Sequence, residues 1–149
     1  MTPFRPFPCA VLLTGLLVLS GCSVEPLKPG YSAMTTRLWG ASQVPPVTGN
    51  GTGTIEANLD PRTRLLAWTV AYSGLSGPVT GAHFHGPAMA GENAPVVLPF
   101  TGILSSPIQG VATLSPEQAA EFLAGKWYVN LHTAAHPGGE IRAYVPVRP

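Results

Sequence analysis

Two histidines, His83 and His85, stand two residues apart and make up half of the chain's four histidines. Their segment, residues 81–87, has the pattern of a strand that enters a turn at Gly86. Because residues i and i+2 of a strand point to the same face, the two imidazoles are expected to lie side by side. This arrangement suits a bound metal ion or an anion.

A second polar stretch holds the other two histidines, His132 and His136. If the two stretches meet, His83, His85 and His132 form a three-imidazole site, with His136 as a fourth or optional ligand. Imidazole suits copper, zinc and nickel, and one copper ion is the favoured cofactor, with zinc as the alternative. Met89 would offer a soft ligand to Cu(I). The opposing hypothesis is that the histidines only form hydrogen bonds at strand ends and in loops.

Strand alternation indicates which face each side chain takes. In residues 126–133 the apolar side chains share one face, and the polar Tyr128, Asn130 and His132 share the other. The same alternation sets His83 and His85 opposite Ala82 and Phe84. We therefore expect an outward-facing histidine cluster beside an exposed polar row that would suit a protein or glycan partner: Tyr128, Asn130, Arg142 and Tyr144.

Polar residues near the histidines have expected structural roles. Glu140 is expected to pair with Arg142 or to accept a hydrogen bond from a histidine. Asn130 is expected to form hydrogen bonds across strands or to the loop before Gly138. The turns that follow His85 and His136 are expected at the same end of the fold, which would bring their loops together.

Short apolar runs separated by Gly, Pro and Asn predict eight strands, at residues 34–39, 53–59, 65–72, 79–85, 95–100, 109–114, 126–133 and 140–147. One helix is expected near 116–124, with Ser115 as N-cap, Gln118 completing a capping box and Gly125 at its end. This pattern predicts an all-β fold, an antiparallel Greek-key β-sandwich or barrel. Pro146 suggests that the chain ends at a sheet edge. The expected core is Leu66, Trp68, Val70, Tyr72, Val97, Trp127, Val129, Leu131, Ile141, Ala143 and Val145.

Residues 1–21 have the layout of a secretory signal peptide, with Arg5 before an apolar run too short to span a bilayer as a helix. The run ends in Leu19-Ser20-Gly21-Cys22, which resembles the bacterial lipoprotein cleavage motif. The resemblance implies that Cys22 carries a lipid. Residues 22–33 would form a tether and residues 34–149 the folded domain. The expected location is the bacterial cell envelope, anchored to the membrane through Cys22, with the periplasmic side of the outer membrane favoured.

Composition argues against several function classes. From Cys22 onward seven Lys and Arg balance seven Asp and Glu, so nucleic acid is not an expected partner. Cys9 would leave with the signal peptide and Cys22 would be acylated, so no disulfide is expected. The sequence has no nucleophile elbow, paired carboxylates or phosphate loop, so redox chemistry at a bound copper is the one enzymatic route it suggests.

Four segments in order resemble the CHRD domain, a module named after chordin that also occurs alone in bacterial secreted proteins: residues 41–47, 82–88, 114–125, and 128–133 with 137–142. The resemblance covers residues 34–145 and implies an immunoglobulin-like or related β-sandwich, without a settled activity. A weaker resemblance connects His83-Phe84-His85 with the copper-binding strand of Cu/Zn superoxide dismutases, which are Greek-key barrels. The chain lacks the disulfide, the zinc-binding loop and the number of histidines found in those enzymes, which puts dismutase activity in doubt.

These observations predict a lipid-anchored, cell-envelope CHRD-domain protein that binds a metal ion through its histidine cluster. The alternative is a metal-free module that binds an envelope protein or a glycan.

Overall fold

The computed structural model describes Met1 and residues 32–146 of the chain. The predicted signal peptide, Cys22 and most of the tether lie outside these residues. Within the described part, no helix combines the length and the apolar character needed to cross a membrane. The elements are β1 (Ser32–Trp39), η1 (Gly40–Ser42), β2 (Thr52–Asp60), β3 (Leu65–Ser73), β4 (Val79–His85), β5 (Val96–Pro99), β6 (Ile108–Thr113), α1 (Pro116–Leu123), β7 (Tyr128–Thr133) and β8 (Ile141–Tyr144).

Each predicted strand is present, and β4 has the predicted bounds. The helix begins as its sequence indicates: Ser115 Oγ accepts from the Gln118 backbone N–H at 3.1 Å, and Gln118 Oε1 accepts from the Ser115 N–H at 2.9 Å. Gly125 follows the helix with φ +67°, a conformation that favours glycine. Local sequence signals are therefore enough to define these elements.

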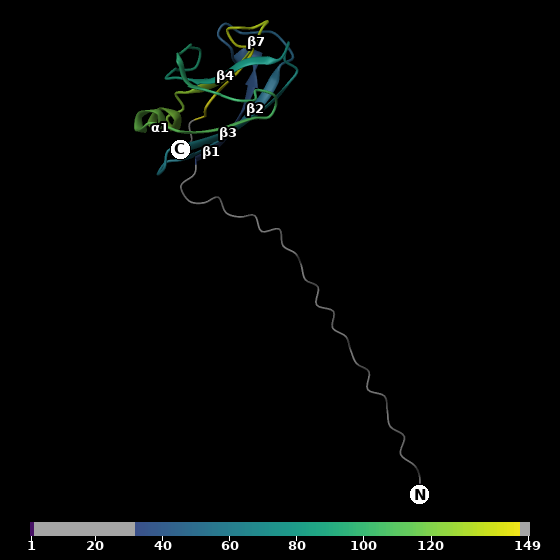
Figure 1. Cartoon of the computed structure of the whole chain (residues 1–149), viewed down its shortest axis with the longest axis vertical. Helices are drawn as coiled ribbons and strands as arrows, with labels where there is room; N and C mark the ends of the chain where they lie inside the picture. The colour runs from purple at the N-terminus through teal and green to yellow at the C-terminus, as the bar shows by residue number, and fades with distance from the viewer. Residues whose placement is uncertain (2–31, 147–149) are drawn as a thin grey trace.

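The strands form one antiparallel sheet in the order β5-β4-β7-β8-β1-β2-β3-β6. The sheet curls so that distant strands face each other (Figure 1). Trp68 of β3 packs edge-on against Phe84 of β4, with ring centroids 5.5 Å apart, although four strands separate β3 from β4 in the sheet order. The prediction of an all-β sandwich or barrel is confirmed.

The core fills the space inside the curl. Nine of the eleven expected core residues are buried, and the other two, Tyr72 and Val97, are partly buried against them. Burying each large apolar side chain stabilises the fold by about 1.5–3 kcal/mol. The aromatic centre of the core joins strands from both halves of the sheet to the helix through Trp68, Phe84, Phe100, Phe122 and Trp127.

Two expectations about the arrangement are wrong. The last strand of the described residues, β8, is not at a sheet edge, because it lies between β7 and β1; it stops at Tyr144, before Pro146 could interrupt its ladder. The turns after His85 and His136 are also not at the same end. β4 runs antiparallel to β7, so His85 lies opposite Tyr128, at the start of β7, while the turn containing His136 follows the other end of β7.

Candidate metal centre

The pairing of β4 with β7 brings the two histidine stretches together. His83 lies opposite Asn130, and Gly81 lies opposite His132. As a result His83, His85 and His132 meet on the face of the sheet that points away from the core. One ligand nitrogen from each ring can be chosen so that all three lie within 4.8 Å of one another.

The closest ring contact joins the two strands. His83 Nδ1 lies 3.2 Å from His132 Nε2, and the two ring centroids are 4.9 Å apart. Gly81 leaves room for this contact, because a Cβ at that position would lie 3.1 Å from His83 Cε1 and 3.9 Å from His132 Cδ2. Any larger residue at Gly81 would press on the His83 ring.

Backbone carbonyl groups hold two of the rings in one tautomer. His85 Nδ1 lies 2.9 Å from Ala94 O, and His132 Nδ1 lies 2.8 Å from Pro137 O. A carbonyl oxygen only accepts, so each Nδ1 carries the proton, and in the neutral ring each Nε2 keeps a free lone pair. Metal-binding histidines characteristically donate their other ring N–H in this way.

The lone pairs of His85 and His132 face the same side chain. Asn130 Oδ1 lies 2.9 Å from the Nε2 of each ring. Asn130 itself is buried, with 2% of its surface exposed. Asn130 therefore lies beside the histidines, as predicted. Its side chain contacts a ring nitrogen of His85 on the neighbouring strand and a ring nitrogen of His132 on its own strand.

The surroundings of the cluster favour neutral imidazoles. Burial lowers the pKa of His83 below its usual 6.5, and the neighbouring His132 and His85 lower it further. Burial also lowers the pKa of His85, and it outweighs the hydrogen bonds at Ala94 O and Asn130 that favour the charged form. The neutral ring is the form that binds a metal ion, so both shifts keep these histidines available as ligands.

A loop covers the polar face beside the histidines, so the expectation of an exposed polar row there is wrong. This cover loop, residues 86–95, closes on itself through the hydrogen bond from Gly86 N–H to Pro95 O. It is attached to β7 and β8 through hydrogen bonds to the hydroxyl groups of Tyr128 and Tyr144. Tyr128 OH contacts both backbone groups of Ala94. Under the loop, the side chains of Tyr128, Asn130 and Arg142 are buried, and only Tyr144 keeps partial exposure.

Arg142 links the cover loop to the histidines. It is 1% exposed, donates to Glu92 O and to Asn93 Oδ1, and makes no ion pair with a described carboxylate. Its guanidinium lies 3.6 Å from the centroid of the Tyr128 ring. The Tyr128 ring in turn stacks on His85, with centroids 4.7 Å apart and planes 3° from parallel. The packing order therefore runs from the cover loop through Arg142 and Tyr128 to His85.

The remaining predicted site residues lie elsewhere. His136 is outside the three-histidine cluster and lines a separate pocket of about 230 Å³ with Gln43 and Pro45. Glu140 neither pairs with Arg142 nor bonds to a histidine, because its carboxylate accepts hydrogen bonds from Ser76 and Thr133 instead.

The same contacts explain the charge state of Glu140. Burial raises its pKa, but the hydrogen bonds from Thr133 and Ser76 outweigh burial, so the net pKa lies below the usual value of 4.5. Met89, the suggested soft ligand, has a side chain that is 66% exposed on the cover loop. Neither side chain therefore adds a donor to the cluster.

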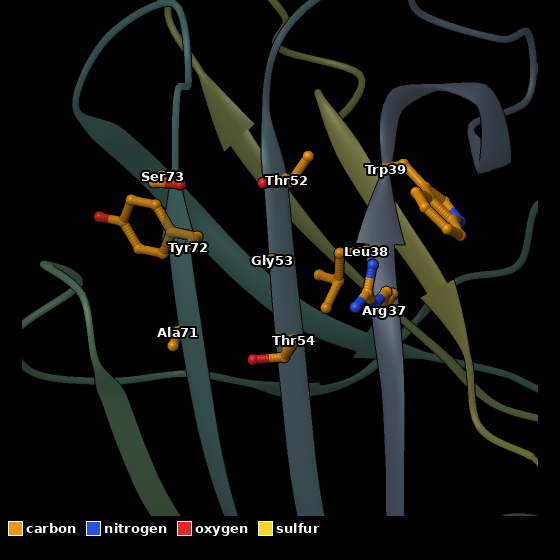
Figure 2. A pocket seen from close by; sticks show the side chains of 9 residues that line it. All are labelled: Arg37, Leu38, Trp39, Thr52, Gly53, Thr54, Ala71, Tyr72 and Ser73. Atoms are coloured by element: carbon orange, nitrogen blue, oxygen red, sulfur yellow. The ribbon is translucent and has the colours of Figure 1, made fainter.

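A larger hollow of about 330 Å³ lies across β1, β2 and β3. Figure 2 shows Trp39 at one side of it and Tyr72 at the other, with Gly53 on the middle strand. Trp39 is 46% exposed. The hollow is lined by no histidine, cysteine or carboxylate, so among the described residues it offers a binding surface but no metal-ligand set.

The family model of the CHRD domain matches residues 34–145. The chain belongs to the CHRD domain family. The match spans the strands that carry the histidine cluster, and it confirms the family resemblance seen in the sequence. No curated protein and no solved structure gives a match to this CHRD chain.

Several groups in the site had not been expected to contribute. The carbonyl groups of Ala94 and Pro137 belong to the backbone, so the types of their side chains do not indicate that they accept hydrogen bonds in the site. The sequence marks Gln43 only as part of a family segment, yet this residue is buried beside Gly139 and Asn130. A polar residue directly before a Val-Pro-Pro segment was the available clue to Gln43.

Proposed function

We propose that this CHRD protein binds one transition-metal ion through His83 Nδ1, His85 Nε2 and His132 Nε2. The observation that carries the proposal is the pair of bonds from His85 and His132 Nδ1 to backbone carbonyls. These bonds leave two Nε2 lone pairs directed at one place, beside His83 Nδ1.

Copper is the proposed metal, with zinc as the alternative. Imidazole nitrogen binds both ions, and among divalent first-row metals copper gives the highest affinity for a given nitrogen site. The lowered pKa values of His83 and His85 support binding at neutral pH because fewer protons compete with the metal.

Metal content tests the proposal directly. The full chain, purified without a histidine tag, is expected to retain about one equivalent of metal or to bind one equivalent of Cu(II) or Zn(II) in a chelator-competition titration. We expect metal affinity to fall at least about 100-fold in each of three variants: His83→Ala, His85→Ala and His132→Ala. Loss of a residue that only supports a ligand typically costs about 10- to 100-fold, so loss of a ligand itself should cost more. His136→Ala is the matched control and should bind like the wild type.

A wild-type protein that is isolated without metal and takes up neither ion would rule out this function. The binding role of the domain would then fall to a protein or glycan, and the hollow beside Trp39 would be the surface to test.

The proposed setting is the bacterial cell envelope, with the domain anchored through a lipid on Cys22. The support is the apolar run that ends in Leu19-Ser20-Gly21-Cys22. Wild-type protein should fractionate with membranes and incorporate a labelled fatty acid, and Cys22→Ser should lose both properties. A wild type that takes up no labelled fatty acid would exclude the anchor.

A further inference from the structure

Asn130 lies where a fourth metal ligand would be needed. Its Oδ1 is 2.9 Å from His85 Nε2 and 2.9 Å from His132 Nε2, while His83 Nδ1 is 3.2 Å from His132 Nε2. Four potential donor atoms from three histidines and one asparagine thus occupy one small region on the polar face.

The tautomers make this a group of acceptors. Because Ala94 O and Pro137 O accept hydrogen bonds from the Nδ1–H groups, the rings of His85 and His132 present unprotonated Nε2 atoms whenever they are neutral. Asn130 Oδ1 beside two such atoms places three partial negative charges together, an arrangement that a cation between them would stabilise. The group has the electrostatic character of a cation site.

The distances are those between neighbouring ligands of one metal ion. With metal–ligand bonds of about 2.0–2.1 Å, adjacent donors lie roughly 2.9 Å apart in a square-planar sphere and roughly 3.4 Å apart in a tetrahedral one. His83 Nδ1 lies 3.2 Å from His132 Nε2, and Asn130 Oδ1 lies 2.9 Å from the Nε2 atoms of both His132 and His85. All three fall within or at the edge of that range.

We infer that Asn130 Oδ1 is the fourth metal ligand and that it closes the site. This inference rests on the proposed metal-binding function. Structural metal sites fill every position with protein groups, whereas catalytic sites keep one position for water or substrate. A site of three imidazole nitrogens and one amide oxygen holds Cu(II) or Zn(II) in preference to Cu(I), since oxygen is a poor ligand for the softer ion. The protein therefore retains a divalent metal ion and does not use it to turn over a substrate.

Gln43 is placed to hold Asn130 in this orientation. Gln43 is buried, and its Nε2 has no hydrogen-bond partner among the described residues. A Cβ on Gly139 would lie 2.5 Å from Gln43 Nε2 and 2.8 Å from Asn130 Nδ2, so the two amide groups lie close to the same side of this glycine. Amide oxygen and nitrogen are assigned from their partners. With the Gln43 amide turned over, its Oε1 faces the Asn130 amide group, can accept from Nδ2, and leaves Oδ1 to the metal.

Azide binding to the Cu(II)-loaded full chain distinguishes a closed site from an open one. In the wild type, added azide should produce no azide-to-copper charge-transfer absorption. Asn130→Leu should bind Cu(II) at least about tenfold more weakly and should develop this absorption, because a ligand position becomes open. Asn130→Asp keeps an oxygen ligand, so it should hold Cu(II) within about threefold of the wild type or more tightly and exclude azide.

Asn58→Leu makes the same chemical change on an exposed position of β2 and should behave like the wild type. Gln43→Met should weaken Cu(II) binding about tenfold, and Gln43→Glu, which keeps an acceptor, should restore it. Azide absorption in the loaded wild type, or wild-type Cu(II) affinity in Asn130→Leu, would overturn the fourth-ligand assignment. The azide result on the wild type decides the matter even if Asn130→Leu does not fold. A wild type that binds no metal at all contradicts the proposed function itself.

Discussion

The two faces of the β4–β7 strand pair are both largely buried, but different physics holds each of them. On the inner face, Phe84 and Val129 pack into the apolar core. On the outer face, Asn130 and His85 are buried under the cover loop, and the rings of His85 and His132 are oriented by hydrogen bonds to backbone carbonyl groups. Apolar packing depends on volume and shape, whereas the outer face depends on which atom donates to which. Burial alone therefore does not separate the structural face from the functional one.

The inner face should be the more sensitive to loss of volume. Phe84→Ala removes a ring that contacts Trp68, Phe100, Phe122 and Trp127, so it should lower the free energy of unfolding by about 3–5 kcal/mol. Urea-induced unfolding followed by tryptophan fluorescence measures this loss.

Val111→Ala is the control for Phe84→Ala, because Val111 is an exposed apolar residue on β6 and its truncation should change stability by less than about 0.5 kcal/mol. Equal effects of the two substitutions would contradict the assignment of Phe84 to a tightly packed core.

The outer face should respond to loss of Arg142 through the cover loop. Arg142→Met removes the donors to Glu92 O and Asn93 Oδ1, and hydrogen bonds from a charged group are worth about 1.5–3 kcal/mol each before the cost of burying the charge is subtracted. We expect a net loss of about 1–2 kcal/mol and faster amide hydrogen exchange in the loop.

Metal binding should weaken in the same variant. Loosening the loop frees Ala94 O, which orients His85, and the loss of such a support typically costs 10-fold or more in metal affinity, with about tenfold expected here. Arg142→Lys, which keeps the charge, should fall between Arg142→Met and the wild type. Unchanged exchange in residues 86–95 of Arg142→Met would mean that Arg142 does not hold the loop.

The contrast between the faces also explains what the sequence could predict. Alternation in β7 separates the apolar Val129 and Leu131 from Asn130 and His132 without reference to any other strand. The grouping of His83 with His132 needs the β4–β7 pairing, which one sequence does not specify. The enclosure of Asn130 and its neighbours was missed because it depends on the path of the cover loop. The carbonyl acceptors at Ala94 and Pro137 belong to the backbone, so side-chain identity cannot reveal them.

The smallest expected effect is a difference in pH dependence between the faces. The pKa values of His83 and His85 lie below the usual 6.5, so the folded protein binds fewer protons than the unfolded chain between those lowered values and about pH 6.5. Their contribution to stability is complete above pH 6.5 and is lost as the pH falls through the lowered pKa values. His83 is partly exposed to solvent and the shift of His85 is opposed by its hydrogen bonds, so the loss in metal-free protein should be less than about 1 kcal/mol.

Unfolding free energies of metal-free protein at pH 7.5, 6.5 and 5.5 measure this dependence. The double variant His83→Gln/His85→Gln should show a flatter profile than the wild type over this range, whereas the penalty of Phe84→Ala should stay constant. Glu140 has a pKa below its usual 4.5, so its contribution is lost only below that range and does not overlap with the histidine effect. Parallel profiles for the wild type and the double variant would mean that the outer face, like the inner one, is insensitive to protons.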